Sequence, residues 1–226
     1  MGDHPHVRRP VLVLIVTCLV VVAWGFAEGA SATEASDRTV LDEGQLRAAA
    51  LREGDVPSGW QPFPQDLIAR ANTPNPSGGP CGQPNTASRA EALAASAALL
   101  VGYEADPQYS WAIYERLYSF PTVGAAKTFA EGGEPCTRWT SNGYTTYRRE
   151  ASAPKLGDSS TRIRLAETQP DGSAGLRQDV VVVRRGNEVI AVGQDRTDGR
   201  KLNQRLTDRY AAVVTKRLDR AIERAG

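Results

Sequence analysis

A run of short strand-like segments in the second half of the sequence constrains the fold most. STRIRLAET (160–168), GLRQDVVVVRR (175–185) and NEVIAVGQD (187–195) are rich in β-branched residues or alternate apolar with polar ones. Two short turns, Pro170 to Gly175 and Arg185-Gly186-Asn187, separate them. Strands joined by such turns pair as antiparallel hairpins. With YTTYRREA (144–151) and WAIYERLYSF (111–120), the sequence predicts an antiparallel sheet of about five to six strands.

Segments with helical spacing surround these strands. The longest runs from Gly199 to Ala225, where leucine, valine and tyrosine recur on one face and basic residues on the other. SRAEALAASAALL (88–100) predicts a helix with Ser88 as its cap and Glu91 completing a capping box. Further helices are expected near 41–53 and 121–131, whereas the proline-rich stretch 62–85 is expected to be irregular. The order of elements predicts an α+β domain with a long C-terminal helix.

The N-terminus has the pattern of an export signal. Arg8 and Arg9 precede an apolar run from Val11 to Ala27, and small residues follow to Ala32. The run suits either a cleaved signal peptide or a retained membrane anchor, and both place the rest of the chain outside the cytoplasm. We therefore expect residues 1–32 to be a signal peptide or N-terminal membrane anchor and residues 33–226 to be a single extracytoplasmic α+β domain, secreted or anchored by the N-terminal segment.

The two histidines, His4 and His6, both lie in the N-terminal segment. The expected mature domain therefore lacks the imidazole that Ser-His-Asp and Cys-His catalysis require and that most transition-metal sites use. No phosphate-binding glycine loop or nucleophile elbow is present, so we predict no enzymatic activity, no cofactor and no metal. A formal net charge of +1 argues against a nucleic-acid partner. Carboxylate-only chemistry remains open in principle, through Asp106, Glu115, Asp158, Asp179 and Asp195.

Two cysteines, Cys81 and Cys136, remain beyond the N-terminal segment. Paired thiols in exported proteins are usually oxidised, so we predict a structural disulfide between them, with a redox pair or two free thiols as the alternatives. The bridge would close a loop of 55 residues (136 minus 81). By loop-closure entropy such a bridge contributes roughly 4 kcal/mol at best.

Several stretches occur in an order that resembles a known family. LREGDVPSGW (51–60), GGPC (78–81), YSFPTVGAAKTF (118–129) and VVVVRRGNEVIAV (180–192) are similar to exported actinobacterial sensor-like domains, namely the PknH extracellular-domain-like proteins and small cell-envelope lipoproteins. The resemblance implies a bent antiparallel sheet with helices packed on one side and a cleft for an unidentified extracellular ligand. It implies no enzymatic activity. The family's second disulfide is missing here, and Trp139 follows Cys136 rather than preceding it.

Three functions follow as hypotheses. The first is a sensor-like domain that binds a small molecule, lipid or glycan on a sheet face carrying Trp111, Tyr114, Tyr118, Tyr144 and Tyr147, with Trp111, Tyr114 and Tyr118 as possible ligand contacts. The alternative for these aromatics is packing in the core or across strands, which is the commoner role of such residues. The second is a structural envelope protein, or one that binds a protein partner. The third is a carboxylate-based hydrolase. In each case membrane contact is expected only through the N-terminal segment, if it is not cleaved.

Overall fold

A computed structural model describes residues 40–76, 79, 83–106, 110–132 and 136–226. The signal or anchor segment 1–32 and the start of the predicted domain lie outside the described residues, as does Cys81. Within the described ranges, no helix is long and apolar enough to cross a bilayer.

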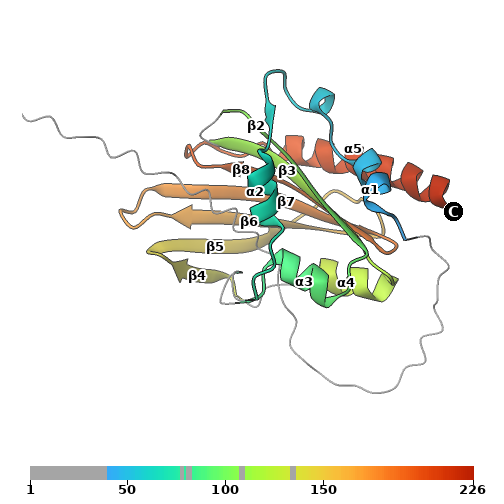
Figure 1. The fold of residues 1–226 in the computed structure, drawn as a ribbon. Helices are drawn as coiled ribbons and strands as arrows, with labels where there is room; N and C mark the ends of the chain where they lie inside the picture. The colour runs from blue at the N-terminus through green and yellow to red at the C-terminus, as the bar shows by residue number, and fades with distance from the viewer. Residues whose placement is uncertain (1–39, 77–78, 80–82, 107–109, 133–135) are drawn as a thin grey trace, which may run out of the picture.

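The centre of the fold is one antiparallel sheet of eight strands in the order β1-β2-β3-β8-β7-β6-β5-β4 (Figure 1). The prediction of an antiparallel sheet is thus confirmed, but the predicted number of strands was too small. The three strands that were missed are β1, β2 and β4. In sheet order the strands are β1 Gln61–Pro62, β2 Ala97–Glu104, β3 Trp111–Ser119, β8 Glu188–Arg196, β7 Ala174–Arg185, β6 Ser159–Thr168, β5 Tyr144–Ala151 and β4 Arg138–Ser141.

Helices cover both faces of the sheet, which corrects the expectation that they pack on one side. The helices α1 (Glu43–Ala49) and α5 (Gln204–Ala225) lie on one face, whereas α2 (Gln65–Ala71), α3 (Thr86–Ala92) and α4 (Val123–Glu131) lie on the other (Figure 1). The sequence of β7 explains why both faces are covered. Its residues Val180–Val183 are all apolar, whereas a strand covered on one face only would alternate apolar with polar residues.

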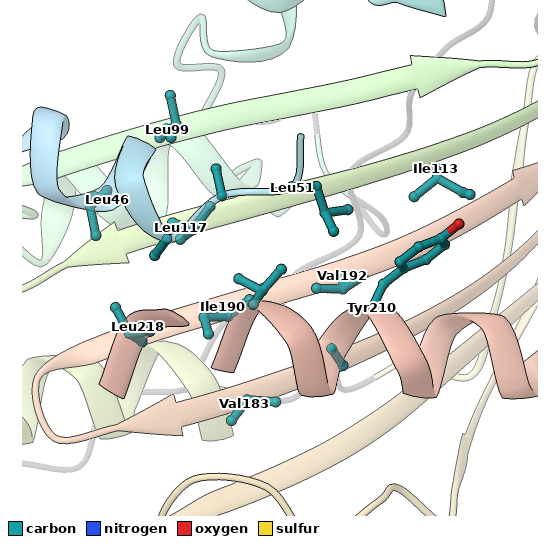
Figure 2. Packing of buried hydrophobic residues seen from close by; sticks show 14 of the residues in the cluster. Leu46, Leu51, Leu99, Ile113, Leu117, Val183, Ile190, Val192, Tyr210 and Leu218 are labelled. Carbon is teal, nitrogen blue, oxygen red and sulfur yellow. The ribbon is translucent and has the colours of Figure 1, made fainter. Parts of the chain in front are cut away.

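Two apolar cores result, one on each face. Val181 and Val183 contact the core under α1 and α5, while Val180 and Val182 contact the core under α2 to α4. Figure 2 shows the first core, in which Leu218 and Tyr210 of α5 pack against β8. The predicted apolar stripe of the C-terminal helix is therefore buried as expected, although α5 begins at Gln204 rather than near Gly199.

The predicted helix over 88–100 is wrong in its second half. The helix α3 ends at Ala92, the backbone turns at Ala94 with φ of 52°, and β2 begins at Ala97. The cap is Asn85, whose side chain accepts a hydrogen bond from the Ser88 backbone N–H at 2.9 Å. Pairing of β2 along the full length of β3 outweighs the high helix propensity of its alanines and leucines.

Candidate functional site

An open pocket of about 600 Å³ lies on the α5 face of the sheet, just beyond the N-terminal end of α5. The helix α5 packs over β7 and β8 and starts only at Gln204, so it leaves the neighbouring ends of β5, β6 and β7 uncovered. The segment before α5 forms a wall of the pocket. We call this site the cationic pocket; the residues that define it are Tyr147, Arg149, Arg164, Arg177, Lys201 and Gln204.

The strand register brings the sheet residues of the pocket together. Tyr147 pairs with Ala166, and Ala166 pairs with Arg177, which makes one row across β5, β6 and β7. Directly paired residues in an antiparallel sheet project from the same face, as do residues two apart along a strand. The next row on this face is therefore Arg149, Arg164 and Asp179.

Asp179 is the acid at the base of the pocket, and it is almost completely buried. Its Oδ1 accepts a hydrogen bond from Nε of Arg164 at 3.0 Å and lies 3.6 Å from Nε of Arg162. Its Oδ2 accepts a hydrogen bond from the Thr207 hydroxyl of α5 at 2.8 Å. Arg162 also forms an ion pair with Asp208 of α5. This network pairs the buried charges and fixes the first turns of α5 to the sheet.

Three other cations of the pocket have no such partner. Arg149, Arg177 and Lys201 form no ion pair with any described residue. Asp179 is neutralised by Arg162 and Arg164, so it does not offset these three charges. These three cations therefore give the pocket a positive potential, which its low-dielectric walls focus and which attracts anions.

Tyr147 adds an aromatic surface to the pocket. Its side chain is 46% exposed, and among the described residues Val40 and Tyr144 are the other exposed large hydrophobic residues. The guanidinium carbon of Arg138 lies 5.4 Å from the centre of the Tyr147 ring, and this contact holds the ring in place. The arrangement offers a flat, exposed ring beside the cations of the pocket.

The structure separates the three aromatics proposed from the sequence. Trp111 lies on the α5 face, where Trp60 packs edge-on at 4.8 Å and the Arg196 guanidinium lies 4.6 Å from its ring centre. Tyr114 and Tyr118 project from the opposite face and are buried in the core there. Tyr114 and Tyr118 therefore pack among other core residues, and of the three aromatics Trp111 alone shares a face with Tyr147.

The five acidic residues considered for catalysis do not gather in one cleft. Asp158 accepts a hydrogen bond from the Gly186 backbone N–H at 2.7 Å and supports the β7–β8 turn, and Asp106 bonds to Ser110 beside β3. Asp179 belongs to the ion-pair network above. Glu115 and Asp195 are buried on opposite faces of the sheet.

Two of these acids, together with Glu188, have perturbed pKa values. Burial raises the pKa of Glu115 to about 8, against a hydrogen bond from the Leu51 backbone N–H. Burial likewise raises the pKa of Asp195 to about 7 and that of Glu188 to about 7. Each has polar partners within the core and none of them lines the cationic pocket, so we assign them to structure rather than to chemistry.

The described residues contain no group of three or more Cys, Asp, Glu or His side chains that could hold a metal ion. Cys136 lies just before β4, but Cys81 is outside the described residues, so the disulfide between them stays a prediction.

Sequence reasoning missed the cationic pocket as a site. Arg149, Arg164 and Arg177 stand on three different strands, and each looks like an ordinary solvated residue of an alternating strand. Only the register of two hairpins places them together, and Lys201 joins them from the segment before α5. The sequence signal that could have indicated the site is the pair Arg162 and Arg164 at alternate positions of β6, together with the polar segment that leads into α5.

Comparison with known proteins bears on the fold. No family model and no curated protein sequence matches the chain. Among solved structures, the extracellular domain of PknH from Mycobacterium tuberculosis is similar, with a TM-score of 0.56, 15% sequence identity, and coverage of 81% of this chain and 99% of that chain. A putative uncharacterized protein (Rv0999 ortholog) from Mycobacterium smegmatis matches with a TM-score of 0.36, 12% identity, and coverage of 71% and 78%. The chain thus resembles the PknH extracellular domain in fold, as its sequence motifs predicted.

Proposed function

We propose that this chain is an exported, non-enzymatic, sensor-like domain of the cell envelope that binds a ligand in the cationic pocket. The observation that carries the proposal is the open pocket of about 600 Å³, a size typical of small-ligand sites, with three cations that form no ion pair with any described residue. The fold shared with an extracellular domain and the export pattern at the N-terminus support the location.

A protein that only docks a partner is the alternative, and it has less support. A docking face usually exposes a contiguous apolar patch. The large hydrophobic side chains exposed in the described part of the chain are Val40, Tyr144 and Tyr147, and Tyr147 belongs to the pocket.

Native mass spectrometry of the full chain, purified from its source organism, tests the proposal. We expect a bound small molecule on the wild-type chain. Ala166 is exposed on the pocket floor, so Ala166→Trp would fill the pocket and should remove the bound mass. Ala174→Trp, at an exposed position of β7 outside the pocket, is the matched control and should retain it. A chain that is always empty and captures one protein equally well in both variants would overturn the proposal.

A further inference from the structure

We propose that the ligand of the cationic pocket is a ring-shaped polyol or saccharide that carries a phosphate group. This inference rests on the ligand-binding function proposed above and names the chemistry of the ligand. Its two parts correspond to two features of the pocket: a cluster of cations, and an exposed aromatic ring beside it.

The charges favour phosphate over a single carboxylate. Arg149, Arg177 and Lys201 contribute three positive charges that no described acid pairs. One carboxylate would neutralise one of them, whereas a phosphate monoester carries close to two negative charges at neutral pH and three acceptor oxygens. Two of the three cations are arginines, whose planar guanidinium groups bind phosphate oxygens in pairs.

A fourth cation, Arg164, is already oriented toward the pocket. Asp179 accepts a hydrogen bond from its Nε at 3.0 Å, and the side-chain oxygen of Gln204 accepts one from its Nη2. Because Asp179 is itself held by Thr207, the guanidinium of Arg164 is fixed before any ligand arrives. A cation held in place in this way loses little conformational entropy on binding.

Tyr147 is the residue against which the ring of the ligand packs. It lies in the same row as Arg177, with only the small side chain of Ala166 between them in the sheet. A ligand whose phosphate contacts Arg177 would therefore lay its next atoms over Ala166 and against the Tyr147 ring. The C–H bonds of a polyol or sugar ring carry partial positive charge and fit the negative face of an aromatic ring.

Isothermal titration calorimetry of the full chain with three probes tests this chemistry. The probes are myo-inositol 1-phosphate, which has both parts, inorganic phosphate, which has the anion alone, and myo-inositol, which has the ring alone. We expect myo-inositol 1-phosphate to bind at least about tenfold more tightly than either fragment, since it gains the contacts of both. Equal affinity for myo-inositol, or for inorganic phosphate, would overturn the inference, as would tighter binding of adenosine monophosphate.

Matched variants separate the two parts of the site. Arg149→Gln and Arg177→Gln should each weaken binding of myo-inositol 1-phosphate about tenfold or more, whereas Lys216→Gln on the exposed side of α5 should not.

Tyr147→Ala should weaken binding of myo-inositol 1-phosphate but leave binding of inorganic phosphate unchanged. Its control is Tyr144→Ala, because Tyr144 is also exposed on β5 but lies outside the pocket. Loss of inorganic phosphate binding in Tyr147→Ala would contradict the assigned role.

The phosphate group could belong to a free sugar phosphate or to a lipid headgroup. Flotation with phosphatidylcholine vesicles, with and without phosphatidylinositol 4-phosphate, whose headgroup carries a phosphate monoester on the inositol ring, distinguishes them. Binding to the phosphatidylinositol 4-phosphate vesicles that Arg177→Gln abolishes supports the inference with a lipid source, and binding of the free probe alone supports it with a soluble source.

The experiments also distinguish failure of the ligand chemistry from failure of the function. If no phosphate probe binds but a different molecule is displaced by Ala166→Trp, the ligand chemistry is wrong and the binding function stands. If no probe binds and no molecule is displaced, both are wrong.

Discussion

Asp179 of β7 accepts a hydrogen bond from Nε of Arg164 on β6 at 3.0 Å, and this contact links the stability of the fold to the candidate site. The same carboxylate holds Thr207 of α5 and faces the buried Arg162. It therefore positions a cation of the pocket and anchors the helix that follows the pocket wall.

Replacing this carboxylate should destabilise the domain strongly. In Asp179→Asn the buried Arg162 and the partly exposed Arg164 lose a shared counter-ion, and breaking a buried ion pair typically costs about 3–5 kcal/mol. Urea denaturation measures the free energy of unfolding. The control is Asp66→Asn, which breaks an exposed i,i+4 pair with Arg70 and should cost no more than about 0.5 kcal/mol. Equal losses in the two variants would contradict the role of Asp179.

The domain should be more stable at pH 5 than at pH 8. The folded-state pKa values of Glu115, Glu188 and Asp195 are raised to about 8, 7 and 7, so between pH 5 and these values the folded chain binds more protons than the unfolded chain. Stability then falls as pH rises, by up to about 1.4 kcal/mol per pH unit for each such group.

The melting temperature as a function of pH checks this prediction. Glu115→Gln is the informative variant, because the amide cannot ionise and the decline toward pH 8 should become shallower. Glu43→Gln, on the exposed surface of α1, should leave the pH profile unchanged. Stability that rises steadily from pH 5 to pH 8 would show that these carboxyl groups are not held protonated in the folded state.

Gly193 on β8 should tolerate no side chain. It pairs with Tyr114, whose ring lies across it, so a Cβ at this position would collide with that ring. Overpacking of a core typically costs about 1–3 kcal/mol, and we expect a loss of that size for Gly193→Ala in chemical denaturation. Gly54→Ala is the control, since nothing lies within 4 Å of a Cβ built there. A neutral Gly193→Ala would mean that the Tyr114 ring is free to move aside.

The predicted bridge between Cys81 and Cys136 should be intact in the exported chain. Mass spectrometry of unreduced tryptic peptides should find the two cysteines linked, and Cys136→Ser should lower the free energy of unfolding by roughly 2–4 kcal/mol. Alkylation of either cysteine without prior reduction would contradict the bridge.

The sequence predicted those parts of the fold whose patterns are local. The β6–β8 hairpins follow from their turns and β-branched residues, and α5 follows from its apolar stripe. The strand β2 was mistaken for helix because AALL favours a helix in isolation, and only pairing with β3 decides otherwise. The apolar Val180–Val183 run carried the information that both faces of the sheet are covered.

The candidate site could not be predicted in the same way. Arg149, Arg164 and Arg177 come together through the register of separate strands, and no local pattern encodes that register. The aromatics chosen from the sequence failed to share a face for a simpler reason. Trp111 and Tyr114 are three residues apart in one strand and therefore project from opposite faces.

An NMR titration of the full chain, with the arginine side chains labelled with ¹⁵N, tests the central claim most directly. Myo-inositol 1-phosphate should shift the Nε–Hε signals of Arg149, Arg164 and Arg177, while those of Arg220 and Arg224 at the far end of α5 stay in place. Shifts confined to residues outside the pocket, or equal shifts in Ala166→Trp, would contradict the claim that this pocket binds the ligand.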